Sequence, residues 1–262
     1  MAGEFQGKVA VITGGSRGIG RAIAAAFAKE GAKTVLISSS EGNLASAAKT
    51  VAAAGGPAPV TIVANLKTLD GCQQAFNAVK DKVGRCDILV NSAGATRAGN
   101  FVDLPDEAWM DGYALKMFAC VRMCRLLWPM LKDAQGHVVN ISGGGARSPG
   151  ADFTIGGSVN AALLNFTKAM SHQGIKDGVR VHAINPGSIE TDRLKGRLAA
   201  QSKAEGIDEA EARRRNLAKL GVARYGLPEE IGHAVCFLAS PVAAGYANGA
   251  IIDIDGGQTR HI

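Results

Sequence analysis

Short apolar runs rich in Val and Ile alternate with longer Ala-rich stretches along almost the whole chain. This alternation is typical of parallel βαβ units, in which a helix carries the chain from one strand to the next. The runs are almost continuously apolar, so helices are expected to cover both faces of the sheet. The pattern predicts strands at residues 8–12, 33–38, 59–64, 87–91, 137–142, 179–184 and 250–254.

One stretch departs from this rhythm. Residues 193–220 are highly charged and contain no apolar run of strand type. Because they follow the sixth predicted strand, they are expected to form a helical lid over the carboxyl ends of the sheet, where open α/β folds bind ligands. We therefore expect one α/β domain over residues 1–262, a Rossmann-type doubly wound parallel sheet of about seven strands with this lid attached.

Composition narrows the class of protein. The chain has 262 residues, of which 47% are hydrophobic, so a sizeable core is expected and disorder is excluded. No apolar run reaches the roughly 18 to 20 residues of a membrane span, and the first residues lack a secretion leader, so a cytoplasmic protein is expected. The five cysteines are odd in number and scattered, which favours reduced thiols over disulfides, and no metal site is expected.

The net charge of +6 suits an anionic ligand. Binding of nucleic acid is not expected, because the basic residues of 193–219 are interleaved with acids and lack stacking aromatic residues. The run Arg213, Arg214 and Arg215 lies among acidic residues and is interpreted as a solvated helix face.

A glycine-rich turn follows the first predicted strand. Residues 13–20 read Thr-Gly-Gly-Ser-Arg-Gly-Ile-Gly and lead into an Ala-rich helical stretch. Gly14, Gly18 and Gly20 match a strand-to-helix turn that brings the backbone close to a pyrophosphate at the helix N-terminus. A glycine turn alone is weak evidence, but here the strand before it and the helix after it match, so a dinucleotide site is predicted.

The choice of dinucleotide depends on the end of the second strand. An acidic residue there would bind the ribose 2′-hydroxyl of NAD(H), whereas this chain has Ser38, Ser39 and Ser40, and Glu41 is expected to belong to the next helix. With no carboxylate to repel a 2′-phosphate and with Arg17 available to pair with it, NADP(H) is favoured over NAD(H).

These residues resemble the short-chain dehydrogenase/reductase family over essentially the whole chain. The resemblance rests on the glycine turn, on Asn-Ser-Ala-Gly at 91–94, on Asn-Pro-Gly at 185–187 with Thr191, and on the segments 224–231 and 253–257. It implies a seven-stranded Rossmann-type sheet, a homotetramer, and hydride transfer between NAD(P)(H) and a small carbonyl or alcohol substrate. Predicted cofactor contacts are Gly14, Ser16, Arg17, Gly18, Ile19, Ser38, Ser39, Asn65, Leu66, Asn91, Ala93, Gly94, Pro186, Gly187 and Thr191.

The chain departs from the family at the positions of its catalytic Asn, Ser, Tyr and Lys. Laid on the family pattern, these positions hold Lys116, Gly143, Gly156 and Asn160, respectively. Shifting the register by one residue recovers Ser142, but no tyrosine lies between Tyr113 and Tyr225. The usual set of residues is therefore not expected, and loss of a general acid typically costs about 10² to 10⁴ in rate.

Three substitutes for the proton donor stay open. Lys116 would serve if burial brings its pKa near neutrality, Asp152 would serve if buried, and Ser142 or Ser158 would bind a substrate oxygen. A quinone or activated alkene, whose reduced form takes its proton from water, would need none of them. The prediction is an atypical NAD(P)-dependent oxidoreductase with Lys116, Ser142 and Asp152 as candidate catalytic residues. The alternative is an inactive dinucleotide-binding protein, acting as a sensor or as a partner in an oligomer.

Overall fold

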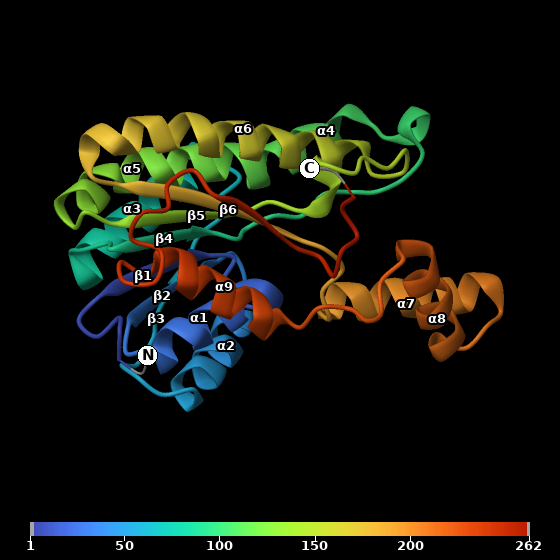
Figure 1. The fold of residues 1–262 in the computed structure, drawn as a ribbon, viewed down its shortest axis with the longest axis horizontal. Coiled ribbons are helices and arrows are strands. Elements are labelled where there is room, and N and C mark those ends of the chain that lie inside the picture. Colours follow the sequence, from blue (N-terminus) through green and yellow to red (C-terminus); the bar gives the residue numbers. More distant parts are fainter. Residues whose placement is uncertain (1–2, 261–262) are drawn as a thin grey trace.

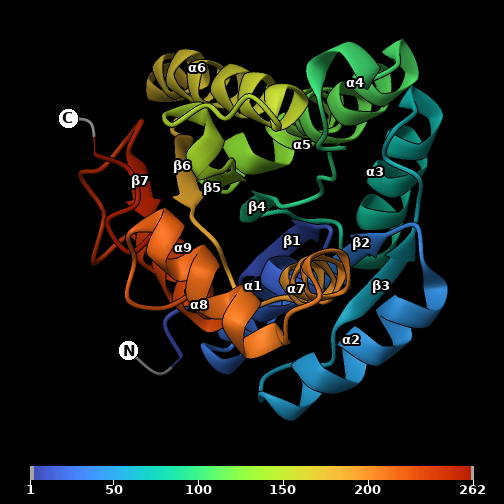
Figure 2. The same ribbon diagram turned by 90° about the vertical axis from the view of Figure 1, so that its right-hand side faces the viewer.

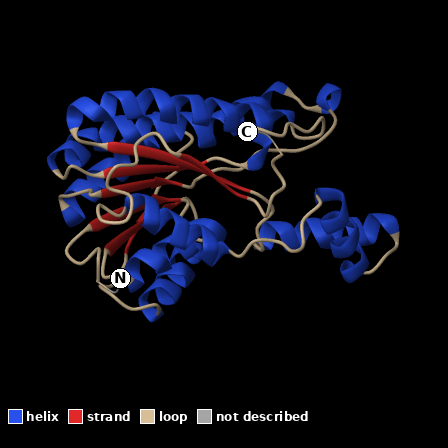
Figure 3. Cartoon of the chain, in the orientation of Figure 1, coloured by secondary structure: helices blue, strands red, loops and turns tan. Residues whose placement is uncertain are grey.

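A computed structural model describes residues 3–260 and shows a parallel sheet between two layers of helices (Figures 1 and 3). The sheet has seven strands in the order β3-β2-β1-β4-β5-β6-β7, and every pair is parallel. This confirms the predicted α/β class and the Rossmann-type doubly wound sheet. The strands are β1 (Val9–Thr13), β2 (Lys33–Ser38), β3 (Val60–Val63), β4 (Ile88–Asn91), β5 (His137–Ile141), β6 (Arg180–Pro186) and β7 (Ile251–Ile254).

All seven predicted strands are present, with ends that differ by one or two residues at most. The largest difference is at β6, which was predicted to end at Ile184 and continues to Pro186. The extension arises because Asn185 and Pro186 pair with Asp253 and Ile254 of β7. A partner strand far along the chain therefore decides where β6 ends, and the local pattern does not contain that information.

The helices divide between the two faces of the sheet (Figure 1). One face is covered by α1 (Gly18–Lys29), α2 (Glu41–Ala53) and α9 (Pro228–Ala239), which share an apolar core with the sheet. The other is covered mainly by α3 (Leu69–Val83), α5 (Ala119–Asp133) and α6 (Thr154–Asp177). The strands are therefore buried on both faces, as their continuous apolar runs indicated.

Shorter elements lie around the loops that follow β4 and β5. They are the 3-10 turns η1 (Phe101–Asp103) and η3 (Gly144–Ala146), the helix α4 (Asp106–Tyr113) and the π-helical turn η2 (Ala114–Phe118). The π-helical turn joins α4 to α5 without a break in the helical backbone. Such turns are rare and often mark functional sites.

The predicted lid is two helices, α7 (Asp192–Glu205) and α8 (Glu209–Leu220), called here the α7–α8 segment. It projects beyond the sheet at the carboxyl ends of the strands, and in the end-on view α7 lies in front of β1 (Figures 1 and 2). It has its own small core, formed mainly by Leu194, Leu198, Ala212 and Tyr225. The arginine run lies on α8, where Arg214 and Arg215 pair with Glu211 in exposed contacts, as expected for a solvated face.

Within residues 3–260 no helix is both long and apolar enough to cross a bilayer. In the same range, no group of three or more His, Cys, Asp or Glu side chains lies together as metal ligands would.

Candidate cofactor and reaction site

The predicted motifs meet at the carboxyl edge of the sheet. Thr13 ends β1, Asn91 ends β4 and Pro186 ends β6. The strand order reverses between β1 and β4, and in open α/β sheets the crevice at such a reversal binds the ligand. The hydroxyl of Thr13 ties the two strand ends together by accepting hydrogen bonds from the backbone N–H groups of Ser92 and Ala93, at 3.1 and 3.2 Å.

The glycine turn brings backbone segments into direct contact. Gly14 has a φ of +68°, and a Cβ there would lie 2.8 Å from the Cα of Ala93. A Cβ on Gly20 would lie 2.3 Å from the carbonyl oxygen of Gly14. These neighbours are backbone atoms that cannot move aside, so the turn requires glycine at both positions.

The N-terminus of α1 is left open for an anion. Arg17 is its N-cap residue and makes no side-chain capping bond, and the first turn contains no acid. The first backbone N–H groups of a helix have no intrahelical partner and carry partial positive charge. The turn therefore fits a dinucleotide pyrophosphate, as predicted.

The groups predicted to surround the adenosine end also lie together. The hydroxyl of Ser16 donates to that of Ser38 at 2.9 Å, which joins the turn to the end of β2. Ser39 and Arg17 are exposed beside them. Ser40 caps α2, so Glu41 belongs to the helix and not to the strand end. No acid occupies the end of β2, and the site fits a 2′-phosphate.

The other predicted cofactor contacts lie along the same edge. Asn65 and Leu66 directly follow β3, with Asn65 exposed and Leu66 buried. The amide of Asn91 turns into the sheet and donates to Asn140 at 2.9 Å. Thr191 precedes α7, and its methyl group lies 3.3 Å from the position of a Cβ on Gly18, so the start of the α7–α8 segment contacts the glycine turn. The remaining members of the set are Ile19, which is partly buried in α1, Gly94 after β4, and Gly187 after β6.

Lys116 lies at the centre of the π-helical turn η2. Its ammonium group donates to the carbonyl oxygen of Ser142 at 2.9 Å, and its side chain packs against Gly94, where a Cβ would lie 3.0 Å from its Cδ. Loss of hydration, followed by the nearby charge of Arg193, lowers the pKa of Lys116 to about 8. Such a lowered pKa is the condition under which Lys116 can serve as proton donor near neutral pH.

Asn160 fills the space beside Gly143. A Cβ on Gly143 would lie 2.8 Å from the Asn160 amide nitrogen, and Asn160 is 2% exposed with no hydrogen-bond partner for its Oδ1 among residues 3–260. Ser142 does not turn into this space, because its hydroxyl donates to the backbone carbonyl of Asn160 at 2.9 Å. The side chain of Ser142 therefore contacts α6, while its carbonyl contacts Lys116.

Phe153 fills the space beside Gly156. A Cβ on Gly156 would lie 2.0 Å from the Phe153 ring, and the same ring lies 3.1 Å from the position of a Cβ on Gly145. No residue larger than glycine fits at position 156 while the ring keeps this position. The ring therefore occupies the space beside Gly156, the position matched to the tyrosine of the family pattern.

The remaining candidates are less well placed. Asp152 is exposed in the loop before α6, so the burial on which its proposed role depends is not found. The hydroxyl of Ser158 donates to the carbonyl of Ile155 within α6 at 3.1 Å. Of the candidate donors, Lys116 has the lowered pKa on which its predicted role depends.

Sequence reasoning missed two residues at this site. Phe153 was not considered, although its position three residues before Gly156 on one helical turn was a usable signal. Arg193, in the first turn of α7, was considered only as part of a basic stretch. Its guanidinium donates to the carbonyl oxygen of Gly94 at 2.9 Å, so it reaches from the lid to the loop after β4.

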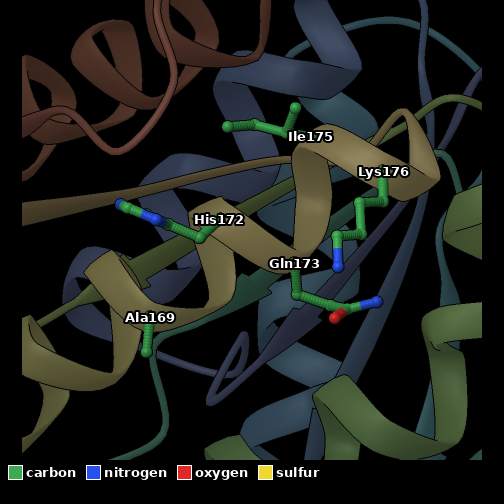
Figure 4. A pocket seen from close by; sticks show the side chains of 5 residues that line it. All are labelled: Ala169, His172, Gln173, Ile175 and Lys176. Atoms are coloured by element: carbon green, nitrogen blue, oxygen red, sulfur yellow. The ribbon is translucent and has the colours of Figure 1, made fainter.

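A hollow of about 510 Å³ lies elsewhere, on the outer side of α6 (Figure 4). Its lining residues all come from the second half of that helix, which leads back to the amino end of β6. They are Ala169, His172, Gln173, Ile175 and Lys176. The hollow is therefore separate from the carboxyl edge of the sheet, where the predicted motifs meet.

Comparison with known proteins decides the family. A family model described as enoyl-(acyl carrier protein) reductase matches residues 14–259. The chain belongs to the short-chain dehydrogenase/reductase family. It is 33% identical over 256 residues to the 3-oxoacyl-[acyl-carrier-protein] reductase of Vibrio cholerae, a match that covers 97% of this chain and 98% of the relative. Membership confirms the resemblance and supports an NAD(P)-dependent oxidoreductase.

Solved structures agree over the full length. The L-sorbose reductase of Gluconobacter frateurii, in complex with NADPH and L-sorbose, has a TM-score of 0.95 and 32% identity, with 100% of each chain covered. An NADPH-bound short-chain oxidoreductase from Pseudomonas aeruginosa, described as containing an atypical catalytic center, has a TM-score of 0.88 and 28% identity, covering 97% of this chain and 98% of that one. Both relatives bind NADPH, which agrees with the preference for NADP(H) expected from the sequence.

Proposed function

We propose that this protein is an NADPH-dependent reductase of small carbonyl compounds in which Lys116 supplies the proton. The observation that carries the proposal is the ammonium group of Lys116, held at 2.9 Å from the carbonyl of Ser142, which directly follows β5. Two relatives are named 3-oxoacyl-[acyl-carrier-protein] reductase and L-sorbose reductase. Both names describe the reduction of a carbonyl compound, which supports this reaction type.

The cofactor is held by the groups predicted for it. The open N-terminus of α1 and the glycine turn bind the pyrophosphate, and Ser38, Ser39 and Arg17 surround the 2′-phosphate. Bound NADPH supplies the hydride. Asn65, Leu66, Asn91, Ala93, Gly94, Pro186, Gly187 and Thr191 complete the predicted contact set, with Gly14, Ser16, Gly18 and Ile19 in the turn itself.

Lys116 holds and delivers the proton. With a pKa of about 8, its ammonium form predominates at neutral pH, and the proton is more acidic than that of an ordinary lysine. The neutral amine left after donation regains a proton from water because its pKa lies near the working pH. The carbonyl of Ser142 fixes the position of the ammonium group, so the rotational freedom of the long side chain is already restricted before a substrate arrives.

The neighbouring residues complete an altered set of catalytic positions. We propose that Lys116, Gly143, Gly156 and Asn160 stand where the family has Asn, Ser, Tyr and Lys. Asn160 offers a buried amide to a substrate oxygen, while Phe153 restricts access of water to the site. Ser142 acts through its carbonyl, and Asp152 is given no role because it is exposed.

The α7–α8 segment is proposed as the substrate lid, since Thr191 and Arg193 connect its base to the glycine turn and to Gly94. A homotetramer is proposed from family membership and from exposed apolar side chains around α4, which include Phe101, Val102 and Met110. Light scattering on the purified protein tests the assembly. The cytoplasmic location expected from the sequence stays a prediction.

Turnover tests the proposed reaction. Purified protein is mixed with NADPH and a panel of ketones, with activated alkenes and quinones as separate arms, and loss of NADPH absorbance is followed. Reduction of ketones is expected, and Lys116→Met should lower kcat by about 10² to 10⁴ without weakening NADPH binding. Lys49→Met, which removes an exposed lysine from α2, is the matched control and should keep wild-type activity.

Two results would contradict the proposal. NADPH binding without turnover in any arm would support an inactive dinucleotide-binding protein. Turnover confined to alkenes, unaffected by Lys116→Met, would support the second candidate, an enoyl-type reductase whose product takes its proton from water. The description of the matching family model favours that candidate over other second choices.

A further inference from the structure

Two cationic side chains meet at Gly94. The guanidinium of Arg193 donates to the carbonyl oxygen of Gly94 at 2.9 Å, and the aliphatic stem of Lys116 packs against the same residue. They reach it from different elements, Arg193 from α7 and Lys116 from η2. The guanidinium of Arg193 therefore lies at Gly94, while the ammonium group of Lys116 lies beyond it at the carbonyl of Ser142, close enough for the two charges to interact.

Neither cation has an acidic partner. Lys116 donates to a backbone carbonyl and so does Arg193, and no carboxylate within residues 3–260 lies in ion-pair contact with either. The other N–H groups of Arg193 have no hydrogen-bond partner in the same range. The arginines of α8 differ in this respect, since Arg213, Arg214 and Arg215 each pair with a glutamate.

More positive charge lies close by. Loss of hydration, followed by the charges of Arg17 and Arg197, lowers the pKa of Arg193. Like charges brought together without an acid repel each other, and a bound anion would relieve that repulsion. A guanidinium with one N–H on Gly94 keeps a free edge that can bind a carboxylate with two parallel hydrogen bonds.

A buried acceptor nearby also lacks a partner. Asn160 is 2% exposed, and its Oδ1 accepts no hydrogen bond from any residue of the range 3–260. Asn160 is linked to Lys116 through Ser142, whose hydroxyl bonds to the Asn160 backbone and whose carbonyl bonds to Lys116. Polar groups that are buried without partners are costly. An acceptor needs a donor, such as the hydroxyl of the alcohol product, so Asn160 is not assigned to the carboxylate.

We propose that Arg193, with Lys116 beside it, binds a carboxylate that the substrate carries next to its reacting carbonyl. The natural substrates are then small oxo acids, in which one or two bonds separate the two groups. Arg193 binds the carboxylate, Lys116 gives its proton to the carbonyl oxygen, and the first turn of α7 is held over the site while substrate is bound. This inference rests on the proposed function, because it takes Lys116 as the proton donor.

An anion at this point has a second source, the phosphates of the cofactor. The glycine turn already provides the open N-terminus of α1 and Arg17 for those groups. The carboxylate is therefore assigned to the substrate, and the experiment separates the two sources.

The kinetic test compares each oxo acid with its neutral methyl ester, using 2-oxobutanoate and acetoacetate as the acids. Arg193→Met should raise KM for the acids about 10- to 100-fold, the loss of one charge-assisted pair, and change KM for the esters by less than about threefold. Arg193→Lys, which keeps the positive charge but lacks the planar guanidinium, should give KM values for the acids between those of the wild type and of Arg193→Met. Lys195→Met, on the exposed side of the same helix, is the matched control and should behave as wild type.

A binding test does not need turnover. Oxamate, a carboxylate that cannot be reduced, should raise the Tm of the wild-type protein in the presence of NADP⁺, whereas neutral oxamide should not. Arg193→Met should abolish the oxamate shift and leave the Kd for NADPH unchanged by fluorescence titration.

The outcomes distinguish this inference from the function on which it rests. Oxamate stabilisation that depends on Arg193, without turnover of any carbonyl, would support the anion site and contradict the reductase. Turnover of neutral ketones with no oxamate effect and equal acid and ester kinetics would support the reductase and overturn the anion site. A raised Kd for NADPH in Arg193→Met, with oxamate binding intact, would assign Arg193 to the cofactor and also overturn the inference.

Discussion

The turn from β1 into α1 and the segment from β5 into the first turn of α6 both contain glycines that leave no room for a side chain, but for different reasons. At Gly14 and Gly20 an added Cβ would strike backbone atoms, at 2.8 and 2.3 Å. At Gly143 and Gly156 it would strike the side chains of Asn160 and Phe153, at 2.8 and 2.0 Å. In the first region glycine is demanded by the path of the chain. In the second it leaves room that other side chains have filled.

This difference separates binding from chemistry. A turn whose backbone contacts require glycine positions a pyrophosphate regardless of the reaction that follows. The connection after β5 is held by side-chain packing, and side chains can be exchanged without changing the fold. We therefore propose that the first region specifies the cofactor, while the second specifies how the proton is handled.

The largest expected effect is in the first region. Gly20→Ala places a methyl group against the carbonyl of Gly14 and should displace the turn, raising the Kd for NADPH about 100-fold or more. Fluorescence titration measures the change. Gly42→Ala is the matched control, since nothing lies within 4 Å of its Cβ position in α2. A normal Kd for Gly20→Ala would show that the turn does not hold the cofactor.

In the second region, Gly156→Tyr should destabilise the protein because the Phe153 ring occupies the space. Overpacking of this kind costs about 1 to 3 kcal/mol, which thermal unfolding would detect as a lower Tm. The double variant Phe153→Ala with Gly156→Tyr should be more stable than the sum of the two single effects, because the new ring takes the vacated space. Strict additivity would mean that the two positions do not share that space.

A smaller effect is expected at the end of β2. Ser38→Asp places a carboxylate where the 2′-phosphate is proposed to bind, and it should weaken NADPH binding about tenfold while leaving NADH binding equal or improved. Parallel titrations with the two cofactors measure the ratio. Equal losses for both would indicate a damaged turn and not a lost phosphate site.

Acid provides a perturbation common to both regions. Burial, followed by the charge of Arg180, lowers the pKa of His137 to about 3, and burial also lowers the pKa of His182 to about 4. Because these folded-state values lie below the ordinary 6.5, their contribution to stability is complete above that pH. This contribution to stability is lost as the pH falls through about 4 for His182 and about 3 for His137. Unfolding followed by circular dichroism and by NADPH release should show one coincident transition, since both regions share one sheet, and His137→Gln should reduce the dependence on pH.

The sequence predicted what depends on local pattern and on a short motif. The seven strands, the turn over Thr13 to Gly20 and the serines after β2 all follow from contiguous residues, and each lies where it was expected. The pair of charged helices after β6 was also recognised from its composition.

Contacts between segments that are distant along the chain could not be predicted from the sequence. Lys116 is 26 residues from Ser142, and Arg193 is 99 residues from Gly94, so no spacing rule indicates that either pair meets. The exposure of Asp152 depends on how the loop before α6 packs, which composition does not reveal. The replacement of one side chain by another in the same space, as with Phe153 at Gly156, becomes visible only in the folded chain.

The pH dependence of kcat for ketone reduction tests the central claim most directly. A proton donor with a pKa of about 8 must be charged to act, so kcat should be constant at neutral pH and fall as the pH rises through about 8. Lys116→Met should give a low rate without this fall. A wild-type profile that is flat through this range, or the same fall in Lys116→Met, would show that Lys116 does not supply the proton.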